Sequence, residues 1–137
     1  AVAGTDQDVK AGPAARLGFK PGQIVIEFGY DEDVDEDFRE SVEGIIGSAL
    51  EDEDYDGVVD AALLWWRDGD GDLTDDLVDT ASLLEDGGFV VLLTPGKGRP
   101  DRVEAFDVQE ACTASGLTAS GGVPVGEWVA QRLVGRR

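Results

Sequence analysis

The sequence predicts a single α/β domain built around a mainly parallel sheet with an antiparallel hairpin at its carboxyl end. Short apolar segments alternate with amphipathic ones, which is the pattern of strand–helix units. The apolar segments 57–66 and 88–94 carry few charges, as expected of central strands that are buried on both faces. The last two strand-like segments, 117–123 and 128–134, flank Gly126, which predicts the hairpin.

The first strand–helix unit spans residues 24–46. Residues 24–29, "IVIEFG", predict a strand, and the following segment repeats apolar residues at helical spacing. Acidic residues fill the first turns of this helix, where they suit the positive end of its dipole, and Gly47 predicts its end. A short edge strand is expected near Leu50.

The remaining elements follow from turns and spacing. After the strand at 57–66, "RDGDGD" predicts a turn, and Asp72 is positioned to cap a helix over 73–85. The segment "DGG" is expected to end that helix before the strand at 88–94, and "PGKGRP" ends the strand. A third helix is predicted from residue 105 or 106 to residue 115.

Residues 16–137 are expected to form the domain, preceded by a flexible arm over 1–15. No apolar run approaches the roughly 20 residues that span a bilayer, so no membrane association is expected. Cys112 is the only cysteine, which favours a reducing cytoplasm. Because the chain has no histidine, we interpret Cys112 as a small apolar residue on a helix and propose no nucleophile–base pair.

The net charge of −19 is concentrated in one part of the chain. Residues 27–86 hold 23 acidic residues and only two basic ones, Arg39 and Arg67. This segment repels nucleic-acid backbones and favours a basic protein partner or cations. The alternative is a solvating surface, including one suited to a salty cytoplasm.

Four segments carry a resemblance to class I S-adenosylmethionine-dependent methyltransferases. "KPGQIVIEFG" resembles that family's first motif, "DYDGVVDAALLWW" its fourth strand, and "LLEDGGFVVLLTP" its double-glycine turn and fifth strand. "ASGLTASGGVPVGEWVAQRLV" resembles its closing antiparallel strand pair. The resemblance implies a Rossmann-like three-layer sandwich over about residues 17–134. The chain also resembles an uncharacterised small domain family of high-GC Gram-positive bacteria.

The loop after the first strand departs from the methyltransferase pattern. In that family it is glycine-rich, whereas here Gly29 is followed by Tyr30 and three acidic residues. Only 27 residues separate Gly29 from Gly57. Because one helix uses most of them, the family's second strand should be short and its third absent. We therefore expect a truncated, non-catalytic, methyltransferase-like cytoplasmic protein that binds a protein partner and requires no cofactor.

The enzyme alternative is a small methyltransferase with an atypical loop. The resemblance then implies that Glu27, Gly29 and Tyr30 border S-adenosylmethionine, while Trp65, Trp66 and Asp68 face the substrate or partner. Consecutive strand residues point to opposite faces, so one of the two tryptophans is expected in the core and the other in a pocket or interface. Core packing of both is the alternative.

A third function, divalent-cation binding, rests on "DGDGDLTDDLVD". Four aspartates match the first, third, fifth and ninth ligand positions of a calcium loop: Asp68, Asp70, Asp72 and Asp76. Leu73 stands where that loop needs glycine, and Asp79 replaces its final glutamate. Helix capping explains the same acids, so no specific Ca²⁺ site is expected.

The carboxyl-terminal hairpin is the expected contact surface for a partner or a homodimer. Its strand edge carries few charges, whereas the acids after Gly29 protect the opposite edge. Trp128 is the candidate anchor, and a core position for Trp128 is the alternative.

Overall fold

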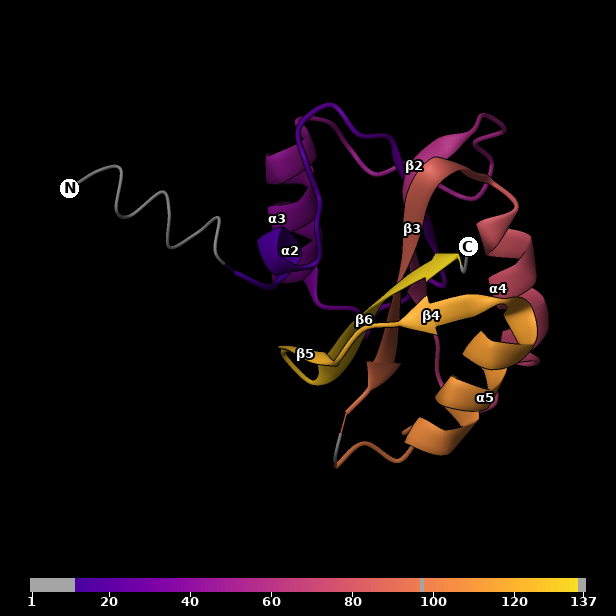
Figure 1. Cartoon of the computed structure of the whole chain (residues 1–137). Coiled ribbons are helices and arrows are strands. Elements are labelled where there is room, and N and C mark those ends of the chain that lie inside the picture. Colours follow the sequence, from indigo (N-terminus) through magenta and orange to yellow (C-terminus); the bar gives the residue numbers. More distant parts are fainter. Residues whose placement is uncertain (1–11, 97, 136–137) are drawn as a thin grey trace.

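The computed structural model describes residues 12–96 and 98–135, which form one mixed sheet with helices on both faces (Figure 1). The strands are β1 (Val25–Phe28), β2 (Val59–Trp65), β3 (Leu84–Pro95), β4 (Leu117–Ala119), β5 (Val123–Val125) and β6 (Trp128–Gly135). The helices are α2 (Pro13–Arg16), α3 (Glu36–Ile46), α4 (Leu73–Ala81) and α5 (Ala105–Ser115). No helix within the described ranges is long and apolar enough to cross a membrane.

The strand order is β1-β2-β3-β6-β4, with β5 also paired to β6. β1, β2 and β3 are mutually parallel, while β6 runs antiparallel to β3, β4 and β5. Gly126, at a positive φ of 56°, turns a hairpin at the predicted place, between β5 and β6. The single strand predicted over 117–123 is instead two short strands, β4 and β5, each paired to β6. The predicted Rossmann-like α/β fold with a terminal antiparallel hairpin is confirmed. The described sheet is mixed and not mainly parallel, because two of its strand pairs are parallel and three are antiparallel.

The sheet separates two hydrophobic cores because strand side chains alternate between its faces. On one face α2 and α3 pack over Leu63 and Trp65 of β2. On the other face α4 and α5 pack over Leu64 of β2 and over Trp66, the first residue after that strand. Consecutive tryptophans thus lie in different layers, and both are buried.

The sheet is truncated beside β1. Between α3 and β2 the chain makes only one parallel bridge, from Glu51 to Ile26. The Glu51 amide donates to the Val25 carbonyl, and the Glu27 amide donates to the Glu51 carbonyl. The edge strand expected near Leu50 is therefore a single bridge, and within the described part of the chain no other strand lies outside β1.

The α4–β3 boundary differs from the prediction. Asp72 caps α4 as expected, but the helix ends at Ala81 and β3 already begins at Leu84. The glycines of "DGG" do not break the chain into a separate turn, because they form a bulge inside β3. Gly87 takes a positive φ of 82°, and a Cβ at Gly88 would press on the Asp60 carbonyl.

The predicted amino-terminal arm is too long. Pro13–Arg16 form α2, and the side chain of Ala14 is buried in the core on the α3 side. Proline at the first helical position explains why a helix starts there. Residues 1–11 of the predicted arm lie outside the described residues.

Candidate functional site

The carboxyl ends of β1 and β2 meet at Gly29. This residue has φ 80°, and a Cβ added there would collide with the backbone carbonyl of Trp65. Only glycine allows β1 to leave the sheet so close to β2. The chain then continues as an acidic loop over residues 30–35, whose last residue, Asp35, caps α3 by accepting a hydrogen bond from the Phe38 amide at 2.8 Å.

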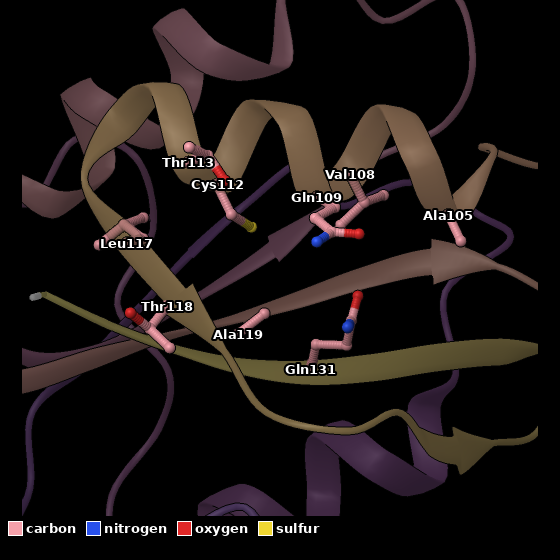
Figure 2. Close-up of a pocket in the computed structure, with 9 residues that line it drawn as sticks. All are labelled: Ala105, Val108, Gln109, Cys112, Thr113, Leu117, Thr118, Ala119 and Gln131. Carbon is pink, nitrogen blue, oxygen red and sulfur yellow. The ribbon is translucent and has the colours of Figure 1, made fainter.

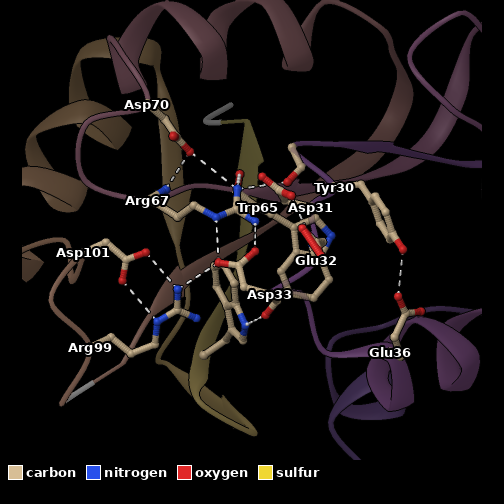
Figure 3. Close-up of polar contacts among 12 residues, drawn as sticks. Tyr30, Asp31, Glu32, Asp33, Glu36, Trp65, Arg67, Asp70, Arg99 and Asp101 are labelled. Atoms are coloured by element: carbon tan, nitrogen blue, oxygen red, sulfur yellow. Dashed lines mark hydrogen bonds and ion pairs between the residues drawn. The ribbon is translucent and has the colours of Figure 1, made fainter.

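Two arginines hold the middle of this loop against the sheet (Figure 3). The Arg67 guanidinium donates to both carboxylate oxygens of Asp33, at 2.6 and 3.0 Å, and Arg99 donates to the same carboxylate at 2.8 Å. Arg99 also pairs with Asp101. Hydrogen bonds from Arg67, and then from Arg99, lower the pKa of Asp33 far below its ordinary value.

Trp128 completes this arrangement from β6. Its indole N–H donates to the Asp33 carbonyl at 3.0 Å, and the guanidiniums of Arg67 and Arg99 lie 5.1 and 4.8 Å from its ring centroid. We call Asp33, Arg67, Arg99, Asp101 and Trp128 the Asp33 network. Because Trp128 is only 2% exposed, it is a core residue and not the exposed interface anchor that the hairpin suggested.

A second network lies deeper, on the α3 side. The buried Glu27 carboxylate accepts two hydrogen bonds from Arg39, at 2.7 and 2.8 Å, and one from the Trp65 indole at 2.8 Å. Arg39 also reaches Glu36, which accepts the Tyr30 hydroxyl at 3.0 Å. These five residues form the Glu27 network. It fixes α3 and the start of the acidic loop to β1, so Glu27 is enclosed in the fold and does not border an open pocket.

An acidic cleft of about 700 Å³ opens on the α4 side of the same strand ends. Part of its wall is apolar, from Phe28, Leu64 and Trp66. Its charged lining consists of five carboxylates and one guanidinium: Asp31, Glu53, Asp70, Asp76, Asp79 and Arg67. Gly29 and Tyr30 also line it. The structure thus brings two of the three predicted cofactor-bordering residues to the cleft.

The carboxylates of the cleft outnumber its single guanidinium, whereas two arginines bind Asp33. Asp70 lies 3.6 Å from Arg67, whereas Asp76 and Asp79 make no ion pair within the described residues. Burial, and then the neighbouring carboxylates with Asp79 first, raise the pKa of Asp76. The cleft therefore has unbalanced negative charge.

The predicted calcium ligands do not converge. Asp72 accepts a hydrogen bond from the Asp75 amide, and Asp70 accepts one from the Arg67 amide. Asp68 and Asp72 line a cavity of about 500 Å³ next to Trp66, whereas Asp70 and Asp76 line the acidic cleft. Within residues 12–96 and 98–135 no three acidic or cysteine side chains are grouped to hold a metal ion. The helix-capping alternative accounts for Asp72, and the proposed ligand set is wrong.

A further cavity, of about 380 Å³, lies between α5 and strands β4 and β6 (Figure 2). The amides of Gln109 and Gln131 face each other across it, and the Cys112 side chain points into it. Burial raises the pKa of Cys112, which keeps the thiol protonated at neutral pH. Cys112 is thus a buried residue on a helix, as predicted. This cavity has no charged side chain in its lining.

Sequence reasoning missed the roles of Asp33 and Asp101. One signal was available: Arg39 and Arg67 are the only bases among 23 acids in residues 27–86, and each anchors a network. The basic turn "TPGKGRP" favours a contact between Arg99 and the acidic half of the chain, and Arg99 makes that contact with Asp33. Asp33 itself, 66 positions away, could not be identified as the partner from the sequence.

The family model described as "Protein of unknown function (DUF3052)" matches residues 14–137. The chain belongs to this family. It is 44% identical over 121 residues to "Uncharacterized protein Rv2239c" of Mycobacterium tuberculosis, covering 88% of this chain and 77% of that protein. The Mycobacterium bovis protein "Uncharacterized protein Mb2263c" matches to the same extent.

Solved structures of class I methyltransferases share the fold at low sequence identity. A ribosomal protein L11 methylase from Lactobacillus delbrueckii subsp. bulgaricus is 15% identical with a TM-score of 0.55, over 90% of this chain and 75% of that one. A methyltransferase from Pyrococcus furiosus is 15% identical with a TM-score of 0.54, over 88% and 78%. CalO1, with SAH bound, is 14% identical with a TM-score of 0.60, over 98% and 55%. This likeness establishes a methyltransferase-like fold.

Proposed function

We propose that this DUF3052 protein is a non-catalytic member of the methyltransferase-like fold that works in the cytoplasm by binding a basic protein partner. The observation that carries the proposal is the acidic loop. Where the fold's enzymes need a glycine-rich backbone platform, this chain has Tyr30 followed by acids, with Asp33 fastened by Arg67 and Arg99. A loop held by its own ion pairs is not arranged to cradle a cofactor.

The truncation of the sheet supports the same proposal. Beyond β1 the chain has a single bridge at Glu51, so the floor that a longer sheet would provide is absent from the described structure. No histidine is present, and Cys112 is buried with a raised pKa. A function through binding requires neither a nucleophile nor a general base.

The test is a calorimetric titration of the purified protein with S-adenosylmethionine, followed by an assay for methyl transfer to proteins of the native cytoplasm. We expect neither saturable binding nor transfer. Saturable binding in the micromolar range together with methyl transfer would overturn the proposal. Binding without transfer would leave a non-catalytic protein that has kept a ligand.

A methyltransferase with an atypical cofactor loop is the second candidate, and the acidic cleft favours it. That candidate needs an open space above the carboxyl ends of β1 and β2, and about 700 Å³ is open there. Glu53 reaches the cleft from the segment that follows the Glu51 bridge. If S-adenosylmethionine binds, Glu53→Gln should weaken it, whereas Glu40→Gln on the exposed face of α3 should not.

A further inference from the structure

We infer that the acidic cleft is the docking site for a lysine- or arginine-bearing segment of the partner, one of whose cationic side chains enters between α4 and the acidic loop. This inference rests on the proposed partner-binding function and adds the place and the chemistry of the contact. Shape is the first support: the cleft is concave and lies at the carboxyl ends of parallel strands, where α/β folds bind ligands.

Charge is the second support. Five carboxylates and a single guanidinium line the cleft, and Asp76 has a raised pKa because burial and neighbouring acids disfavour its charge. A cation placed among these groups relieves that repulsion. The uneven net charge of the chain also speeds the encounter with a basic partner at low ionic strength.

The protein's own Arg67 demonstrates how a guanidinium is held at this site. Its Nη1 donates to the Gly29 carbonyl at 2.9 Å and contacts the Trp65 carbonyl at 3.4 Å, while its remaining nitrogens bind Asp33. Strand-end carbonyls and carboxylates therefore already coordinate one guanidinium at one end of the cleft. Asp76 and Asp79, on α4, are available to bind a cationic side chain of the partner.

The lining also discriminates between occupants. Phe28 and Trp66 offer apolar surface to the methylene stem of a lysine or arginine, which a bare metal ion cannot use. The phosphates of a nucleic acid would be repelled by the same carboxylates. The neutral cavity under α5 has no charge with which to select a cation.

The experiment measures binding of a fluorescein-labelled oligo-arginine peptide by anisotropy to three proteins: the wild type, Asp76→Asn/Asp79→Asn, and Asp37→Asn/Glu40→Gln. The last pair makes the same charge change on the exposed surface of α3, on the opposite face of the sheet. We expect the cleft pair to lose at least about tenfold in affinity and the control pair less than about twofold. Circular dichroism checks that all three are folded, and neither replaced cleft carboxylate makes an ion pair among the described residues.

Equal losses in the two double variants would mean diffuse attraction to an acidic surface and would overturn the inference, as would the absence of peptide binding. Spermine that binds the wild type as tightly as the peptide would assign the cleft to a small polyamine, which also contradicts a protein segment. The two proposals fail separately. Methyl transfer refutes the non-catalytic function. A peptide affinity that is unchanged by Asp76→Asn/Asp79→Asn refutes only the assignment of the cleft as the docking site.

Discussion

Carboxylates on the two sides of the strand ends have opposite electrostatic environments. On the α3 side, Glu27 and Asp33 each accept hydrogen bonds from arginine, and the pKa of Asp33 is lowered. On the α4 side, Asp76 lies among other carboxylates, and its pKa is raised. Asp33 and Asp76 are both aspartates, so the difference comes from their surroundings: arginines bind Asp33, whereas Asp76 is partly buried and lies near other carboxylates.

This difference separates carboxylates that stabilise the fold from carboxylates that are available for the binding we propose. A carboxylate that is paired internally contributes to the stability of the fold and is not free to bind a partner. A carboxylate that lies close to other carboxylates in the folded state lowers the stability of the protein. A bound cation reduces that repulsion. The acidic half of the chain is therefore not electrostatically uniform. On its α3 side, arginines pair with the carboxylates and hold the acidic loop in place. On its α4 side, carboxylates line an open cleft.

The largest effect is expected from Glu27→Ala. The change leaves the partly buried Arg39 guanidinium and the Trp65 indole N–H without their shared acceptor. Removing one partner of a buried ion pair costs about 3–5 kcal/mol, and urea unfolding would measure the loss. Glu27→Gln keeps an acceptor oxygen for Trp65 and should cost less. A loss below about 1 kcal/mol for Glu27→Ala would show that this network does not secure the fold.

A smaller effect is expected from Asp33→Asn, because the Asp33 side chain is 34% exposed. Hydrogen bonds to a charged group contribute about 1.5–3 kcal/mol when shielded, so we expect a loss of about 1–2 kcal/mol at low salt. Salt screens this partly exposed network more than the buried one. The loss should shrink in high sodium chloride, whereas that of Glu27→Ala should persist. Equal salt responses would remove the distinction between the two networks.

The smallest effect, and one of opposite sign, is expected from Asp76→Asn. Because folding raises the pKa of Asp76, its charge destabilises the native state at neutral pH, and neutralising it should stabilise the protein by less than about 1 kcal/mol. The gain should disappear below about pH 4, where the unfolded carboxyl is also protonated. Destabilisation by Asp76→Asn at neutral pH would contradict an unbalanced cleft.

Asp33 should show the reverse pH dependence. Its folded pKa is lowered, so its contribution is complete above the ordinary aspartate pKa of about 4 and is lost as the pH falls toward the lowered value. The difference between wild type and Asp33→Asn should therefore be constant near neutrality and vanish in acid. Urea titrations across this pH range measure both profiles with one protocol.

Strands β1, β2, β3 and β6 and the helix ends at Asp72 and Gly47 were predictable because local rules govern them. Apolar runs with few charges became β2 and most of β3, and Gly47 ends α3 with a φ of 84°. The end of α4 was not predictable, because the bulge at Gly87 and Gly88 depends on pairing with β2. Trp128 likewise gave no local sign that it would be buried against the acidic loop.

By itself the sequence determined an α/β sheet in which the strand expected between α3 and β2 is shortened. It also determined an acidic loop in place of glycines and a strongly negative half with two arginines. Its periodicities, glycines and charges act over a few residues, so they can be recognised without the fold. Only the tertiary structure decided which acids are paired. Arg99 reaches Asp33 from 66 positions away, and α4 places Asp76 in a cleft where five carboxylates face a single guanidinium. Those relations depend on distances across the sheet, which local sequence patterns do not encode.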